Sequence, residues 1–282
     1  MENKARQNKT TIDVNKAWSA VHARLQQEQL ITPPRRRLFM GSALKRAAVF
    51  LLLVAGAAAG IYLNQKPDGS PGKVIRNQET NASLVTTLTD GTVVYLADGA
   101  TLNCPAAFEN ENRKVALTGE AMFDVKSDRQ HPFIIETANA TIKVTGTAFN
   151  VKSFAGQENF ELNVQSGTVE VTRKAGQDRI TVSRGEGIRL AGETWQKKPA
   201  PADLYSSYTR KMKFKDEPVA NLLRVVNRTG DKPIVLKDKA IGDRKITVTF
   251  AGDTSESVAA LICLALHLRQ TASHDTLYIS QP

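Results

Sequence analysis

The sequence contains few of the residue types from which enzyme and metal sites are usually built. It has two cysteines and four histidines among 282 residues, and no histidine stands at metal-ligand spacing from a cysteine or an acidic residue. It has neither the G-x-S-x-G turn of serine hydrolases nor a phosphate-binding P-loop. Glu120 and Asp124 could suggest glycoside hydrolysis, but placement in strands and turns explains them equally well. We therefore expect no enzyme activity, no metal and no cofactor.

The formal charge of +10 is concentrated at the N-terminus. Residues 1–46 hold ten Lys and Arg against three acidic residues, which is a net +7, whereas the other 236 residues hold 28 basic and 25 acidic ones. The charge therefore belongs to a tail and not to a folded face. No zinc-finger spacing or RNA-binding signature accompanies it. We expect no direct binding to nucleic acid.

A run without any charged residue follows the basic tail. Residues 47–63 read AAVFLLLVAGAAAGIYL, which as a helix would be roughly 25 Å long. Lys45 and Arg46 precede the run and Tyr62 lies near its other end, as at two membrane interfaces. A buried core helix would carry a polar stripe, and a signal peptide would not follow so long an N-terminal segment. The run predicts one uncleaved transmembrane helix in contact with the lipid bilayer.

The orientation of this helix follows from the basic residues on its N-terminal side. The positive side stays in the cytoplasm, so residues 1–46 are expected inside and everything after the span outside. This makes the chain a single-pass membrane protein with its N-terminus in the cytoplasm. Gly56 and Gly60 form a G-x-x-x-G pair, which would let two helices approach closely or is a chance result of the Ala- and Gly-rich composition.

Residues 11–30 predict an amphipathic helix in the cytoplasmic tail. One face of this helix carries four apolar residues, Val14, Trp18, Val21 and Leu25. Some forty residues cannot build a core of their own, so a stripe that includes a tryptophan needs a partner. The partner is either the membrane surface or a groove on another protein. The narrow stripe, and the two prolines between it and the basic cluster, favour a protein.

Short runs of β-branched residues begin after a polar linker at residues 64–81. Examples are residues 92–96, 133–135 and 180–182, and turn signals such as Asp90-Gly91 separate the runs. Many short strands with regular turns indicate an all-β domain over residues 82–192. A sandwich and a solenoid-like stack both fit this pattern.

A second linker, residues 193–207, precedes a segment with a different pattern. Residues 208–282 predict the order βαββαβ, which is a small α+β domain with both helices on one face of its sheet. The strands are expected near 212–214, 234–236, 246–250 and 276–279, and the helices at 219–226 and 255–268. Cys104 and Cys263 fall in different predicted domains, so a disulfide between them would require the two domains to touch.

The predicted all-β domain contains four motifs in a recognisable order and spacing. They are LTDGTVVYL at 88–96, RKVALTGEAMFDV at 113–125, HPF at 131–133 and GTAFNV at 146–151. Together they resemble the FecR family of anti-sigma factors, particularly its Bacteroidetes branch, over about 110 residues. The last 75 residues resemble the signalling domains of TonB-dependent receptors and secretins. Met122 and Cys104 depart from the family pattern, in which aromatic residues are common at these positions.

The resemblance implies a function in signal transduction and transcription regulation. Family members bind an extracytoplasmic-function sigma factor through the cytoplasmic segment, here with Val14, Trp18, Val21 and Leu25 as the expected contacts. Their periplasmic part senses the signalling domain of an outer-membrane TonB-dependent receptor, and the signal often passes inward through cleavage by intramembrane or periplasmic proteases. This chain is accordingly expected to be an anti-sigma factor of the inner (cytoplasmic) membrane, with its C-terminal domains in the periplasm.

Two alternatives remain at this stage. Some family members cleave themselves at a Gly-Thr bond, and Gly146 and Thr147 are the matching pair, although a tight strand entry that only glycine fits is the other explanation. The rival function is a membrane-tethered periplasmic carbohydrate-binding or structural module. Aromatic residues make up only 6% of the chain, and Trp195 is the one tryptophan after the span, in a predicted linker, which disfavours glycan binding.

Overall fold

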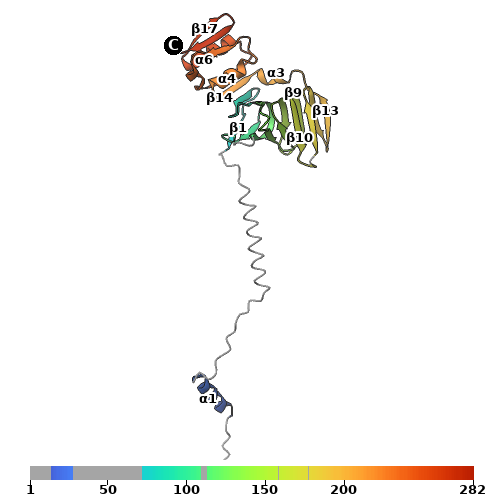
Figure 1. Ribbon diagram of the computed structural model, residues 1–282, viewed down its shortest axis with the longest axis vertical. Helices are drawn as coiled ribbons and strands as arrows, with labels where there is room; N and C mark the ends of the chain where they lie inside the picture. The colour runs from blue at the N-terminus through green and yellow to red at the C-terminus, as the bar shows by residue number, and fades with distance from the viewer. Residues whose placement is uncertain (1–13, 28–71, 109–112, 158, 177) are drawn as a thin grey trace, which may run out of the picture. The chain divides into compact units, whose positions relative to one another are not determined.

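The computed structural model describes residues 14–27, 72–108, 113–157, 159–176 and 178–282 (Figure 1). Its contacts divide the chain into two units, Met1–Pro67 and Asp68–Pro282. The described residues of the first unit form helix α1 (Val14–Gln27), which lies inside the predicted range 11–30. The predicted membrane helix at 47–63 lies outside the described residues. None of the helices in the described ranges is long and apolar enough to cross a membrane.

The described part of the second unit consists mainly of strands. In chain order the strands are β1 (Lys73–Arg76), β2 (Ser83–Thr87), β3 (Val93–Leu96), β4 (Thr101–Cys104), β5 (Arg113–Asp124), β6 (Phe133–Glu136), β7 (Ala140–Val144), β8 (Ala148–Ser153), β9 (Phe160–Ser166), β10 (Thr168–Arg173), β11 (Arg179–Ser183), β12 (Glu186–Ala191), β13 (Thr194–Pro199), β14 (Met212–Pro218), β15 (Ile234–Leu236), β16 (Lys245–Phe250), β17 (Arg269–Ser273) and β18 (Thr276–Ser280). The helices are α3 (Leu204–Thr209), α4 (Val219–Val226), α5 (Lys239–Gly242) and α6 (Ser255–Leu266).

Strand β5 joins two halves of one 15-stranded sheet. Its residues up to Thr118 pair with β4 and β6, whereas its residues from Gly119 on pair with β3 and β8. Gly119 has a φ of 104°, and a Cβ at this position would lie 2.8 Å from the Cα of Ala100. Only glycine fits both the backbone conformation and this close approach, so the strand changes from one half of the sheet to the other at this residue.

The inner faces of the two halves enclose one apolar core. Alternate residues of the strands supply it, and within it the rings of Phe123 and Phe149 stack with centroids 5.6 Å apart. Strand β11 at the end of one half lies against β9 and β12 of the other, which nearly closes the sheet around this core. The domain is therefore all-β as predicted. Its two halves face each other as in a sandwich, but they are continuous through β5, so the sheet is barrel-like.

The C-terminal segment differs from the single four-stranded sheet predicted for it. Strands β14 and β16 belong to the 15-stranded sheet, because β14 pairs in parallel with β2, and β15, β18 and β17 form a separate three-stranded sheet. Helix α6 contacts strands of both sheets. Two elements were missed: α5 has only four residues, and β17 reads RQTAS, without apolar alternation. The helix predicted to reach residue 268 ends at Leu266, because His267 adopts a left-handed conformation.

A second apolar core lies between the outer face of the large sheet and the C-terminal segment. Val85, Tyr95 and Met122 point outward from the sheet and pack with Phe214 and Leu222. This arrangement explains why all four residues of β3 are buried, since the strand is covered on both faces.

Regular structure also occupies the stretch predicted as a linker at residues 193–207. Strand β13 pairs with β12, and Trp195 on β13 packs edge-on against Phe160 with ring centroids 5.5 Å apart. Helix α3 follows directly. Cys104 and Cys263 are both free and lie in different cores, the first on β4 within the large sheet and the second on α6.

Candidate functional site

Helix α1 presents the predicted stripe to solvent. The side chains of Val14, Trp18 and Val21 are 72%, 71% and 47% exposed, and Leu25 is half-buried. Spacings of four and three residues place all four on one side of an α-helix. A tryptophan exposed to this extent is unusual for a residue with so large an apolar surface. The arrangement is suited to insertion into an apolar groove.

The motifs in the first half of the large sheet meet at a buried arginine. Arg113 Nη1 lies 2.8 Å from Asp90 Oδ2, and only 6% and 11% of the two side chains are exposed. The guanidinium also donates to the main-chain oxygens of His131 and Lys126, at 2.9 Å each, and lies 5.5 Å from the ring centroid of Phe133. Three of the four motifs thus meet at the side chain of Arg113. Its partners are a buried carboxylate, main-chain oxygens and an aromatic ring of the same domain, so we interpret its role as structural.

His131 makes a local contact that fits a structural role. Its Nδ1 lies 2.9 Å from Asp128 Oδ2, and its main-chain N–H donates to the other carboxylate oxygen. The side-chain hydrogen bond from His131 lowers the pKa of Asp128 to about 2. In the described part of the chain, no three His, Cys, Asp or Glu residues come together in a way that could hold a metal ion.

Gly146 and Thr147 lie at the entry to β8, in close contact with a neighbouring loop. A Cβ on Gly146, whose φ is 154°, would lie 2.7 Å from the Cα of Ser127. Thr147 is buried, and its Oγ1 donates to the main-chain oxygen of Thr168 at 3.0 Å. A Cβ on Gly167 would in turn lie 2.9 Å from that Oγ1. Close packing is therefore sufficient to explain why a glycine occupies position 146. Self-cleavage at this bond stays a prediction.

The two acidic residues considered for glycoside hydrolysis are each held in a contact with the C-terminal segment. Glu120 accepts a hydrogen bond from the hydroxyl of Tyr208 at 2.7 Å, and Asp124 forms an ion pair with Arg228. Burial raises the pKa of Tyr208, and the nearby charge of Glu120 adds to this effect. These contacts connect the large sheet to α3 and to the turn that follows α4, so both carboxylates are engaged in contacts within the fold.

Tyrosines of α3 were not predicted as contacts. The hydroxyls of Tyr205 and Tyr95 lie 2.6 Å apart, and Tyr208 accepts a hydrogen bond from Asn150. The signal in the sequence was the spacing of Tyr205 and Tyr208, which places two aromatic rings on the same side of a short helix.

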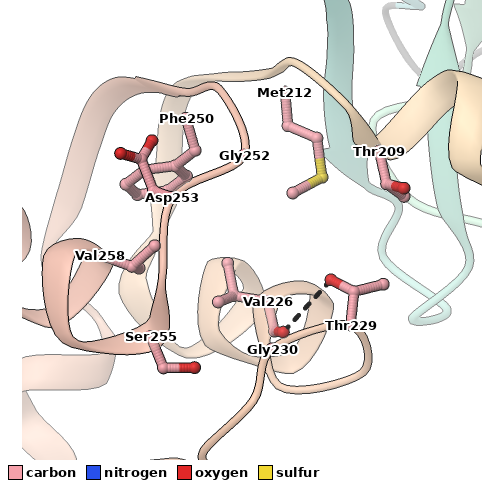
Figure 2. Close-up of a pocket in the computed structure, with 10 residues that line it drawn as sticks. All are labelled: Thr209, Met212, Val226, Thr229, Gly230, Phe250, Gly252, Asp253, Ser255 and Val258. Atoms are coloured by element: carbon pink, nitrogen blue, oxygen red, sulfur yellow. Dashed lines mark hydrogen bonds between the residues drawn. The ribbon is translucent and has the colours of Figure 1, made fainter.

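A pocket of about 290 Å³ lies where β14, α4 and α6 meet (Figure 2). Met212, Phe250 and Val258 supply apolar surface, and hydroxyl-bearing residues and Asp253 supply polar groups. Asp253 is held in its own turn, because its Oδ2 accepts a hydrogen bond from the N–H of Ala251 at 2.8 Å. The pocket has no second titratable side chain in its lining, so it does not resemble a catalytic site.

Comparisons with known proteins bear on the all-β domain. Residues 76–170 match the model of the family described as FecR protein. Two crystal structures of a proposed anti-sigma factor from Parabacteroides distasonis, at 1.65 and 2.50 Å resolution, are 26% identical to this chain. They cover 74% and 75% of it, and 99% of their own chains, with TM-scores of 0.45 and 0.46. None of the curated proteins compared with the chain matches it. The motif geometry and the family match together show that the chain contains a FecR domain.

Proposed function

We propose that the protein is an anti-sigma factor that spans the inner membrane and holds an extracytoplasmic-function sigma factor in the cytoplasm. The exposed apolar stripe of α1 is the observation that carries this proposal. An amphipathic helix docks on a protein by burying such a stripe in a groove, and Trp18 is the residue type most often found as an energetic anchor. The FecR domain supports the assignment, because the resemblance to this family implies that the cytoplasmic segment binds a sigma factor.

The size of the stripe is sufficient for a specific interaction. Burial of a large apolar side chain contributes about 1.5–3 kcal/mol, and Trp18 is surrounded on its face by Val14 and Val21. Trp18→Ala should therefore weaken binding by about 2 kcal/mol or more, which corresponds to roughly 30-fold in the dissociation constant.

The experiment is co-purification of the sigma factor with the full-length chain from membranes, followed by titration of the purified pair. Gln27→Ala is the matched control, because Gln27 is exposed and lies on the side of α1 opposite Trp18. The control should bind as the wild type does. Equal binding of Trp18→Ala and Gln27→Ala would show that α1 is not the contact.

The periplasmic part, in the same proposal, receives the signal from the signalling domain of an outer-membrane TonB-dependent receptor. The C-terminal segment contributes the two strands that end the large sheet and the separate small sheet, so it offers the free strand edges that such a domain could engage. Inward transmission would then end in cleavage by periplasmic or intramembrane proteases, which would release the cytoplasmic helix together with its sigma factor.

The rival proposal, a membrane-tethered carbohydrate-binding module, has less support in the described residues. Glycan binding by all-β domains generally uses exposed aromatic faces. Trp195 is half-buried against Phe160 and the core of the sheet. The co-purification experiment described above separates the two proposals, since a module of that kind would retain no sigma factor.

A further inference from the structure

Strand β16 is an open edge of the large sheet. Within the described residues it pairs only with β14, and it forms the end of the hydrogen-bonded path that runs through β2, β3 and β5. It has six residues, KITVTF, with one charge at its start and no proline. Its pairing with β14 shifts register between Phe214 and Glu217, and the extra residue lies on β14. An open edge of this composition is a template for another strand.

The other edges carry the features by which proteins protect an open strand. Strand β13 ends in Lys197, Lys198 and a proline, and β1 has a charged residue at each end. Strand β11 lies against β9 and β12, and β15 has only three residues. Strand β17 begins with Arg269 and has no apolar residue larger than alanine. By comparison β16 is the least protected edge in the described part of the sheet.

The outward main-chain groups of β16 can be assigned from the pairing. Ser83 donates to the oxygen of Lys211, so the alternate residues of β14, Met212 and Phe214, direct their main-chain groups toward β16. Their register partners Phe250 and Val248 face inward. The N–H and C=O of Thr249, and by alternation those of Thr247, therefore point to the open side.

The two faces beside this edge differ in chemistry. Ile246, Val248 and Phe250 lie on the face that packs into the second core. The other face carries Thr249 and its register partner Lys213, near which Lys215 is exposed and Lys245 pairs with Asp216, its Nζ 3.3 Å from Oδ2. Lys213 forms an ion pair with Glu79, and it lowers the pKa of that carboxyl with smaller contributions from Lys211 and Lys215. Positive charge therefore exceeds negative charge on this face.

We propose that β16 accepts an extended segment of the receptor's signalling domain as an additional strand, whose alternate residues are acidic toward the lysines and apolar toward the second core. This inference rests on the receptor contact proposed above. Main-chain hydrogen bonds to Thr247 and Thr249 would supply affinity, and the lysine-bearing face would select the acidic side chains.

The first test is amide hydrogen exchange of the full-length wild-type chain, with and without the signalling domain of the receptor that co-purifies with it. The amides of Thr247 and Thr249 should exchange at least tenfold more slowly in the complex. Unchanged exchange at both amides in a saturated complex would overturn the edge assignment while leaving the receptor contact intact. A chain that captures no receptor at all would overturn both proposals.

The second test uses two variants at one position. Thr249→Pro removes the outward N–H and keeps the inward ladder, because proline is tolerated at edges whose N–H faces solvent, whereas Thr249→Val keeps the N–H. The proline variant should bind the receptor domain at least tenfold more weakly than the valine variant at equal melting temperature. If the proline variant fails to fold, Lys215→Glu replaces it and should weaken binding several-fold and reduce its salt dependence. Affinity equal to the wild type in the folded variant would contradict the proposal.

Discussion

Replacement of Arg113 by methionine should destabilise the second unit, Asp68–Pro282, more than any single surface change. Methionine retains the unbranched stem that lies over Phe133, but it removes the charge and all the hydrogen bonds of the guanidinium. Asp90, whose side chain is 11% exposed, would then keep the hydrogen bonds from Thr92 as its remaining contacts among the described residues. Removal of one partner of a buried ion pair typically costs about 3–5 kcal/mol, because the other charge is left without compensation.

The loss of stability can be measured by unfolding the purified chain with denaturant in detergent, with tryptophan fluorescence as the signal. Trp195 packs on Phe160 in the folded state, whereas Trp18 is 71% exposed already, so the signal reports mainly on the second unit. Arg129→Met is the matched control. Arg129 is exposed, and its replacement should change the free energy of unfolding by less than about 0.5 kcal/mol.

A double variant examines the physical reason. If the cost comes from the uncompensated charge of Asp90, then Asp90→Asn combined with Arg113→Met should cost at least about 1 kcal/mol less than the sum of the two single changes. A loss below about 1 kcal/mol for Arg113→Met, or strictly additive single changes, would refute the view that this ion pair organises the three motifs.

Three further predictions concern other parts of the described structure. Glu217→Gln should raise stability at neutral pH, because burial raises the pKa of Glu217 and the folded state disfavours its charged form. The gain in stability should vanish below about pH 4, where Glu217 is protonated in both the folded and the unfolded state, and should grow as the pH rises through the folded-state pKa. Equal gains in melting temperature at pH 4 and pH 8 would contradict this prediction. Gly146→Ala should lower the free energy of unfolding by about 1–3 kcal/mol, because the added Cβ would be too close to Ser127. The wild-type chain should run as one band on a denaturing gel. Two bands that become one in Thr147→Val would establish self-cleavage. Truncation after residue 203 should cause self-association in size-exclusion chromatography, because it uncovers the outer apolar face of the large sheet; a monodisperse truncated chain of unchanged stability would show that the two parts fold independently.

The sequence predicted the position of a strand correctly where buried and exposed side chains alternate along it. The apolar run at residues 133–135 became β6, and that at 180–182 lies within β11, because each places alternate side chains in the core of the sheet. Strand β13 was missed because TWQKKP has one large apolar residue and a terminal proline, which reads as a linker. Its place is set by pairing with β12, and a single sequence contains no local signal for that pairing.

Local sequence patterns also could not predict the ion pair of Arg113 or the topology of the C-terminal segment, because both join residues that are far apart in the sequence. Arg113 and Asp90 are 23 residues apart in two different motifs, and nothing in either motif indicated that the two side chains form an ion pair. The parallel pairing of β14 with β2 joins residues about 130 positions apart. One signal was available in the sequence: VVYL at residues 93–96 has no polar alternation, which is typical of a strand covered on both faces.

The pairing of β14 with β2 also bears on how a receptor signal would travel. A strand added to β16 would extend a hydrogen-bonded path through β14, β2, β3, β5 and β4 to β1, the strand nearest in sequence to the predicted span. The contacts of Glu120 and Asp124 with the C-terminal segment hold the same two parts together. Receptor binding at one end of this path would therefore act on β1 through one packed unit, without an intervening linker. Variants that loosen this packing, such as Tyr208→Phe combined with Arg228→Met, should retain receptor binding at β16 but weaken the response of the sigma factor, and an undiminished response would argue that the signal reaches the membrane by another route.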